Sequence, residues 1–294
     1  MSEPLVVIGD AIIDVLENDD GTFVRLPGGA ALNLAVGLAV LGLPVVQLTT
    51  TGIDRDGGLL RRYLNERGVT MCRAPGADFT GVATSQRING EPTYSFSPSM
   101  LRRHYSFGTA AITAMEHAPA VVVDTYPLDR PEQVDRLYAA LSTAAGLRVI
   151  DPNPRPALVG NVHDYRAGFE RIASLAALVK VSDEDIDLLY GVSADRVVGQ
   201  LLDSGATAVL HTRGAAGARL VRADDVRIDV PIAPRPGPVT DTLGAGDATL
   251  AVVVAGLLTC GIDAPAGALE SLLTRAMEVA ATTARAPGGL LRLP

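Results

Sequence analysis

The chain alternates short runs of β-branched and leucine residues with alanine-rich segments of helical length, and this alternation limits its possible folds more than any other feature. Such runs are typical of strands buried in a parallel sheet, and the segments between them are typical of crossover helices. The expected strands lie at 5–8, 45–49, 120–123, 147–150, 177–181 and 208–211. We therefore predict an α/β fold of three layers, with a mostly parallel central sheet flanked by helices.

The expected helices are rich in alanine, leucine and valine. They lie at 30–41, 56–67, 131–144, 183–190, 194–203, 245–259 and 266–284. No interruption between them is typical of an interdomain linker, so residues 1–294 are expected to form a single domain. A length of 294 residues is large for one domain, although α/β domains routinely reach about 250 residues.

Two segments depart from this alternation. Residues 12–26 are expected to form two strands around a turn at 18–21, because Asn, Asp and Gly tolerate the positive φ of tight hairpins. Residues 80–96 repeat the pattern around Asn89-Gly90. Together they predict a small sheet that projects from the main body, and we expect segments 11–27 and 79–107 to form a lid. Exposed strand edges often pair, so a homodimer through this lid is also expected.

Composition and charge limit the partners. The formal net charge of −8 disfavours nucleic acid and anionic membranes, because both attract basic surfaces. The most apolar stretch, 250–258, is far shorter than the roughly 20 residues that a membrane span needs. The two cysteines, Cys72 and Cys260, lack metal-ligand spacing, which favours a reduced, cytoplasmic protein. We therefore expect a small-molecule substrate, with no nucleic-acid or membrane partner.

The most informative motif is DTLGAGD, residues 241–247, which precedes a long apolar helix. Gly244 and Gly246 allow the backbone to approach a ligand closely. A helix that starts here directs the N–H groups of Gly244, Ala245 and Gly246, and its positive dipole end, at an anion. Asp247 could instead only favour the helix dipole, which contributes about 0.3 to 1 kcal/mol.

The phosphate site that this helix start predicts is not of the Walker type. No G-x-x-x-x-G-K-[ST] occurs, and Lys180 is the single lysine among 25 basic residues. Phosphate contacts are therefore expected from arginine, backbone N–H groups and metal ions rather than from lysine.

The DTLGAGD motif resembles the C-terminal signature of the ribokinase-like, phosphofructokinase-B type sugar kinases. Further motifs resemble that family in the same order along the chain: Gly9-Asp10 with Asp14, PGGAALNLA at 27–35, GIDRDG at 52–57, DPNPR at 151–155, KVSDED at 180–185 and TRGAAG at 212–217. DPNPR and KVSDED resemble the fructokinase branch in particular. The resemblance implies an ATP-dependent sugar kinase that acts on fructose or a related ketose or pentose, with Mg²⁺ and possible activation by K⁺.

The resemblance also assigns roles around the sugar. It implies that Asp247 deprotonates the attacking hydroxyl, and that the sugar is bound by Asp10, Asp14, Gly28, Gly29, Asn33 and Arg155. The residues alone allow plainer roles, since Asp10 could be a turn-former at a strand end and Arg155 a surface charge. Asn33 lies in an otherwise apolar helix, where a polar side chain is costly unless a ligand or a neighbouring loop supplies a partner.

The nucleotide side of the site follows from the same resemblance. It implies ATP-binding roles for Lys180, Ser182, Thr212, Gly214 and Gly217, a water-mediated magnesium contact at Asp185, and a monovalent-cation contact at Asp241. Ser182 followed by acids is also an ordinary helix N-cap pattern. Both roles can hold at once.

Two positions in the sequence depart from the family pattern. Leu250 stands where the family usually has an aromatic residue, and so does PALV at 156–159. These changes leave the identity of the sugar open. Separately, the main alternative is a nucleoside kinase of the same fold, as in the adenosine-kinase-like relatives of this family. A non-catalytic sugar-binding regulator is a second alternative, although the intact DTLGAGD motif argues against it.

Overall fold

The computed structural model describes residues 3–294 apart from 18–19, 76 and 89–90. Half of the turn expected at 18–21 and both residues of Asn89-Gly90 therefore lie outside the described residues. The strands are β1 (Leu5–Ile8), β2 (Ile12–Glu17), β3 (Phe23–Gly28), β4 (Val45–Thr49), β5 (Val69–Arg73), β6 (Val82–Ile88), β7 (Glu91–Phe96), β8 (Ala120–Asp124), β9 (Leu147–Asp151), β10 (Leu178–Ser182), β11 (Ala208–Thr212), β12 (Ala218–Arg222) and β13 (Arg227–Val230).

The helices complete the chain. The α-helices are α1 (Ala30–Val40), α2 (Arg55–Asn65), α3 (Pro98–Leu101), α4 (Thr109–His117), α5 (Pro131–Thr143), α6 (Val162–Ala173), α7 (Asp183–Leu189), α8 (Ala194–Asp203), α9 (Ala245–Cys260) and α10 (Ala266–Thr283), and two 3₁₀ turns span Pro156–Leu158 and Gly214–Ala216. Every helix among the described residues is too short or too polar to cross a lipid bilayer.

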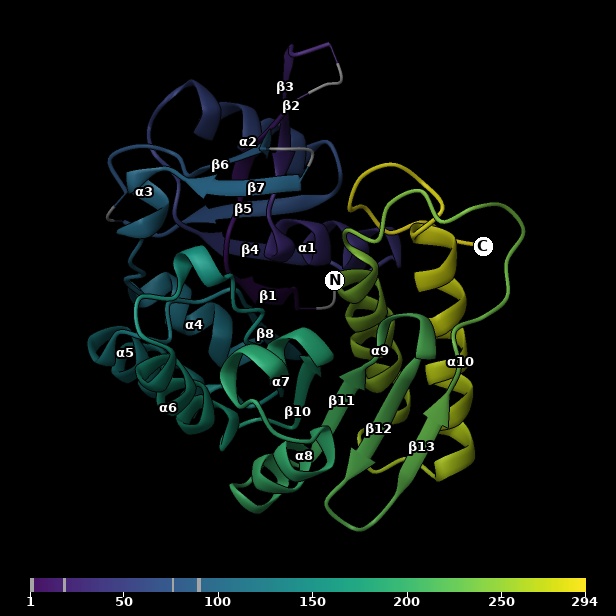
Figure 1. The fold of residues 1–294 in the computed structure, drawn as a ribbon. Coiled ribbons are helices and arrows are strands. Elements are labelled where there is room, and N and C mark those ends of the chain that lie inside the picture. The colour runs from purple at the N-terminus through teal and green to yellow at the C-terminus, as the bar shows by residue number, and fades with distance from the viewer. Residues whose placement is uncertain (1–2, 18–19, 76, 89–90) are drawn as a thin grey trace.

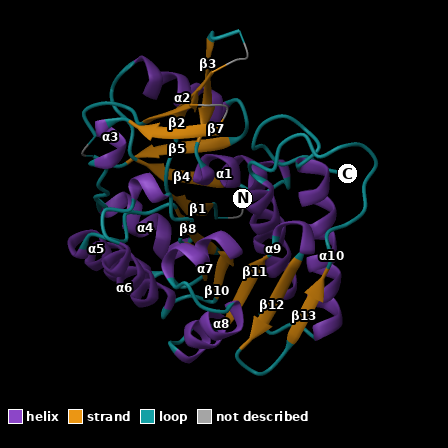
Figure 2. Cartoon of the chain, in the orientation of Figure 1, coloured by secondary structure: helices purple, strands orange, loops and turns teal. Residues whose placement is uncertain are grey.

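The central sheet has the strand order β13-β12-β11-β10-β9-β8-β1-β4-β5 (Figure 2). All pairings from β11 through to β5 are parallel, and only β12 and β13 join antiparallel at one edge. The predicted mostly parallel sheet is confirmed.

Helices cover both faces of this sheet (Figure 1). Alternate residues of β1 point to opposite sides, so that Leu5 and Val7 pack with α1, α2, α9 and α10, while Val6 and Ile8 pack with α4 to α8. A strand buried on both faces must be apolar at nearly every position, which explains the continuous apolar runs in the sequence. The three-layer prediction is confirmed.

A second, smaller sheet has the order β3-β2-β6-β7 and lies beside the central sheet near α2 and α3 (Figure 1). The pairs β2–β3 and β6–β7 are antiparallel hairpins, and β2 pairs with β6 in parallel. The small sheet predicted from the two hairpin segments is therefore present. Whether segments 11–27 and 79–107 act as a lid stays a prediction.

The order in which strands are added to the central sheet reverses between β1 and β8. From β1 the chain adds β4 and β5 on one side, and from β8 it adds β9, β10 and β11 on the other. A side chain at Gly9, just after β1, would lie 2.1 Å from the carbonyl oxygen of Asp124 at the end of β8. The carboxyl ends of strands at such a switch point are the usual ligand crevice of open α/β sheets.

Candidate active site

The start of α9 lies next to the C-terminal segment. Gly244 is the N-cap with φ 74°, and a Cβ there would lie 1.9 Å from the carbonyl oxygen of Gly289, so glycine is required both for conformation and for space. The N–H of Ala245 donates to the carbonyl of Thr242 at 3.2 Å. The N–H groups of Gly246 and Asp247 follow in the first turn, where a helix offers no internal acceptor. The helix start is half-buried, so an anion can reach it.

Asp247 is buried in this first turn, with 8% of its surface exposed. Its Oδ2 accepts a hydrogen bond of 3.2 Å from Nδ2 of Asn33 in α1. Burial raises the pKa of Asp247 to about 7, although the charge of Lys180, the Asn33 hydrogen bond and the charge of Arg155 oppose the rise. A carboxylate with this pKa can accept a proton near neutral pH. The hydrogen-bond partner of Asn33 in this structure is thus the candidate base in α9, rather than a neighbouring loop.

Gly28 and Gly29 make room for two acids, Asp10 just after β1 and Asp14 in β2. A Cβ on Gly28 would lie 1.9 Å from Oδ2 of Asp14, and a Cβ on Gly29 would lie 2.8 Å from the carbonyl oxygen of Asp10. Oδ1 of Asp10 accepts from the N–H of Ala31 at 3.2 Å, so Asp10 holds the start of α1 as well as facing the site. Burial raises the pKa of Asp10, and burial with the charge of Asp10 raises the pKa of Asp14 to about 6.

Lys180 in β10 lies in a buried network with two acids, one at the end of β9 and one in the first turn of α7. Its Nζ is 3.0 Å from Oδ2 of Asp151 and 3.7 Å from Oδ2 of Asp185. Burial lowers the pKa of Lys180, but the charges of Asp151 and Asp185 outweigh it and the pKa is raised. A Cβ on Gly246 would lie 3.6 Å from the same Nζ, so the ammonium group lies directly below the α9 start.

Ser182 and Asp185 form a complete capping box at the start of α7. The N–H of Ser182 donates to Oδ2 of Asp185 at 2.7 Å, and the N–H of Asp185 donates to Oγ of Ser182 at 3.1 Å. The plainer N-cap role predicted for this motif is therefore present. It leaves the second carboxylate oxygen of Asp185 available for another contact.

Arg155 completes the cluster from the β9 side. Its side chain is exposed and follows the DPNPR turn. Partial desolvation lowers the pKa of Arg155, but the charges of Asp247, Asp10, Asp124 and Asp185 raise it above the usual value. The carboxylates whose charges act on Arg155 are thus those of the site.

Asp124 is a site residue that the sequence analysis missed. It ends β8, is fully buried, and lies opposite Asp151 at the end of β9. Its Oδ1 accepts from Nδ2 of Asn153 at 3.0 Å and from Oγ1 of Thr125 at 2.7 Å, whereas Oδ2 is buried without a hydrogen-bond partner among the described residues. Burial, then the charges of Asp247 and Asp10, raise the pKa of Asp124.

The predicted nucleotide residues lie at the same edge of the sheet. Thr212 at the end of β11 lies in register with Ser182 at the end of β10. Gly214 and Gly217 form the turn after β11 with φ 50° and 91°. Asp241 accepts from the N–H of Leu243 at 2.9 Å and from that of Gly288 at 3.3 Å. The bond from Gly288 joins the DTLGAGD loop to the C-terminal segment, and the cation contact of Asp241 stays a prediction.

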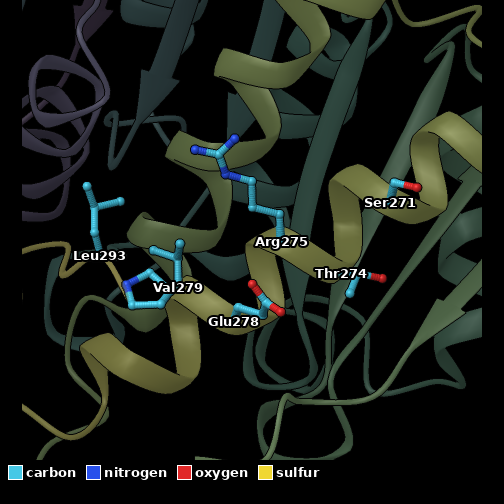
Figure 3. A pocket seen from close by; sticks show the side chains of 7 residues that line it. Ser271, Thr274, Arg275, Glu278, Val279 and Leu293 are labelled. Atoms are coloured by element: carbon cyan, nitrogen blue, oxygen red, sulfur yellow. The ribbon is translucent and has the colours of Figure 1, made fainter.

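Two further observations define the limits of the site. No group of three His, Cys, Asp or Glu side chains in the described part of the chain is arranged to hold a metal ion. A surface hollow of about 420 Å³ lies elsewhere, along α10 and the C-terminus, and is lined by Ser271, Thr274, Arg275, Glu278, Val279, Leu293 and Pro294 (Figure 3). No predicted site residue contributes to it.

Fold and site together define a class of protein: an α/β enzyme with an anion-binding helix start beside a buried carboxylate at the carboxyl edge of its sheet. The pfkB family of carbohydrate kinases matches residues 2–294. The fructokinase of Klebsiella pneumoniae is 30% identical over 305 residues, which cover 100% of this chain and 97% of that protein.

Solved structures of kinases have the same fold as this chain. A fructokinase with bound ATP from Xylella fastidiosa has a TM-score of 0.83 at 23% identity, covering 98% of this chain and 94% of that one. An aminoimidazole riboside kinase from Salmonella enterica, complexed with aminoimidazole riboside and an ATP analogue, has a TM-score of 0.80 at 26% identity, covering 99% and 96%. The chain belongs to the pfkB family of carbohydrate kinases, and it is therefore a phosphotransferase with an alcohol group as acceptor.

Proposed function

We propose that this chain transfers the γ-phosphoryl group of ATP to a hydroxyl of a small sugar, with fructose or a related ketose or pentose as the first candidate. The observation that carries the proposal is the placement of Asp247, a buried carboxylate with a raised pKa, in the half-buried first turn of α9. The similarity to the Klebsiella pneumoniae fructokinase supports the choice of sugar.

In the proposed reaction, Asp247 accepts the proton of the acceptor hydroxyl while the hydroxyl oxygen bonds to the γ-phosphorus and ADP leaves. General base catalysis of this kind contributes about 10² to 10⁴-fold. The N–H groups of Gly246 and Asp247, with Gly244 giving the close approach, stabilise charge on the transferring group. Ala245 supplies the turn that forms this cradle, because its own N–H is engaged by Thr242.

The acceptor sugar is proposed to lie between the central sheet and the smaller sheet. Asp10, Asp14 and Asn33 offer oxygen and amide groups to its hydroxyls, and Gly28 and Gly29 allow a close backbone approach. Closure of segments 11–27 and 79–107 over the sugar would exclude water and limit ATP hydrolysis.

The nucleotide is proposed to lie along Thr212, Gly214, Gly217, Lys180 and Ser182. Mg²⁺ would neutralise phosphate charge, and it is typically bound by one or two carboxylates, waters and the phosphates themselves. The free oxygen of Asp185 fits a contact through water, and it needs no dedicated cluster of acids. Asp241 is the proposed contact of a monovalent cation such as K⁺.

A coupled assay of ADP formation tests the proposal over fructose, ribose, glucose, ketodeoxygluconate and adenosine. Sugar-dependent ADP formation above the ATP-only rate is expected for fructose or another ketose or pentose. No turnover with any acceptor, together with a ligand-induced rise in melting temperature, would favour a non-catalytic sugar-binding regulator.

A nucleoside acceptor is the second candidate. The aminoimidazole riboside kinase structure, similar over 99% of this chain, is the observation that favours it. The same assay with adenosine and aminoimidazole riboside separates the two, because a nucleoside kinase will prefer these acceptors over free sugars by its catalytic efficiency.

We further propose a homodimer through the smaller sheet in a reducing, cytoplasmic compartment. The edge strand β3 carries Phe23 and Leu26, which are 48% and 44% exposed, and exposed edges favour pairing. Cys72 and Cys260 are both free, as expected in a reducing compartment. Analytical ultracentrifugation of the wild type and of Phe23→Ser measures the first point, with a monomer expected only for the variant.

A further inference from the structure

The DPNPR turn is fixed at three points. The N–H of Asn153 donates to Oδ1 of Asp151 at 3.1 Å, and the hydroxyl of Tyr165 donates to the carbonyl of Pro152 at 2.6 Å. The third point crosses to the neighbouring strand, where Nδ2 of Asn153 donates to Oδ1 of Asp124 at 3.0 Å, and both side chains are buried. This third bond joins the Asn153 side chain of the turn to the end of β8.

The backbone on both sides of this bond is unusual. Among the described non-glycine residues, Thr125, Asn153 and Asp225 have positive φ values, of 52°, 38° and 67°. Asp225 lies in the exposed turn between β12 and β13, whereas Thr125 and Asn153 are buried and donate to the same oxygen of Asp124. Strained residues persist where surrounding contacts hold them, and they cluster at functional sites.

The strained position lies two residues before Arg155. The intervening Pro154 and the following Pro156 both have fixed φ, so this short segment has little freedom to absorb a change at Asn153. The carbonyl of Arg155 accepts from the N–H groups of Leu158 and Val159 at 2.7 and 3.1 Å, which fixes the far side. The position of the Arg155 Cα and the direction of its Cα–Cβ bond are therefore set largely by the backbone at Asn153.

We propose that Asp124 is a positioning residue: by accepting the side-chain hydrogen bond of Asn153 through Oδ1, it directs the guanidinium of Arg155 toward the transferring phosphoryl group. Arg155 carries the charge, and Asp124 and Asn153 act through it. The inference rests on the proposed kinase function. It adds a role for two residues at the switch point between β1 and β8 that have no part in the proton transfer.

Four variants test the link by steady-state kinetics with ATP and the sugar found in the screen. Asp124→Leu removes the acceptor, and Asn153→Gly removes the donor while glycine adopts the positive φ without strain. Each is expected to lower kcat about tenfold to a hundredfold, since displacement of a reacting group by about 1 Å has effects of this size. The KM for ATP is expected to change less than about threefold.

Asp124→Asn keeps an oxygen acceptor and is expected to recover kcat to within about fivefold of the wild type. Asp129→Asn, the same change five residues downstream at an exposed acid that accepts from the N–H of Gly160, is the control and should match the wild type.

A double-mutant cycle gives the decisive reading. In an Arg155→Ala background, adding Asn153→Gly is expected to change kcat less than about twofold, because the two residues act as one unit. The proposal is overturned if the losses in kcat of Arg155→Ala and Asn153→Gly are fully additive. It is also overturned if Asp124→Asn is as inactive as Asp124→Leu. If Asp124→Leu does not fold by thermal melting, Asn153→Gly alone carries the test. Absence of sugar phosphorylation in the wild type and in Asp129→Asn would instead refute the proposed function.

Discussion

Replacing Gly244 with alanine perturbs the α9 start in a way whose size can be worked from the structure. The new Cβ would lie 1.9 Å from the carbonyl oxygen of Gly289, and ordinary contact begins near 3.4 Å, so the two segments must separate by about 1.5 Å. The residue also has φ 74°, where a side chain costs roughly 1–2 kcal/mol. With about 1–3 kcal/mol for the overpacking, the free energy of unfolding should fall by about 2–5 kcal/mol.

The same displacement should also lower the catalytic rate. A shift of about 1 Å in a site can lower the rate about 10²-fold, so kcat of Gly244→Ala is expected to fall at least that far. Gly261→Ala is the control for backbone strain without a clash, because Gly261 ends the same helix with φ 81° and ψ 158°, a region adopted almost only by glycine, and a Cβ at this position would meet no other atom within 4 Å. It should cost about 1–3 kcal/mol of stability and leave kcat intact.

Urea unfolding and the coupled ADP assay measure both quantities on both variants. The reasoning is refuted if Gly244→Ala keeps kcat within threefold of Gly261→Ala. That result would mean that the contact between the DTLGAGD loop and Gly289 does not fix the anion cradle.

Three further predictions concern protonation and packing. The kcat/KM of the wild type should fall as pH drops through about 7, because a protonated Asp247 accepts no proton, and a rate profile from pH 5 to 9 measures this. Asn33→Leu removes the hydrogen bond that lowers the pKa of Asp247, so the acid limb should move to higher pH by about one unit, and an unmoved limb would contradict the contact. Asp54→Ala removes an acceptor of three hydrogen bonds, two of them from Thr80, and should lower the free energy of unfolding by about 2–4 kcal/mol. The nearby Asp56→Ala, which breaks only an exposed ion pair, should cost less than about 1 kcal/mol in the same urea titration.

Local signals in the sequence were enough for six of the nine strands of the central sheet and for the helix that carries the base. All six expected strands are present, each within one residue of the predicted bounds. Helix α9 begins at Ala245, the residue predicted from the glycine motif. These elements are either apolar throughout or marked by glycine, so their own residues determine them.

The sequence analysis missed other elements. The α6 helix, Val162–Ala173, was not predicted, although its buried residues Tyr165, Gly168, Phe169, Ile172 and Ala173 follow the spacing of an amphipathic helix. The β12–β13 hairpin was not predicted either, because as an edge pair it alternates buried residues with exposed or half-buried arginines and acids such as Arg219 and Asp229. The antiparallel edge of the central sheet was therefore missed.

Contacts between distant segments could not be read from the chain. The sequence indicated that Asn33 needs a partner, but only the packing of α1 against α9 shows that this partner is Asp247. The link from Asp124 to Asn153 depends on the adjacency and register of β8 and β9. A usable signal did exist, because AVVVD and LRVID both end an apolar strand in aspartate. Parallel strands bring such ends to one edge.

The central claim is that Asp247 removes the proton from the acceptor hydroxyl at the start of α9. Sugar phosphorylation by Asp247→Asn, compared with ATP affinity from calorimetry on the same protein, tests it most directly. The account predicts a loss of at least about 100-fold in kcat with ATP affinity changed less than about threefold. Turnover near that of the wild type would contradict it.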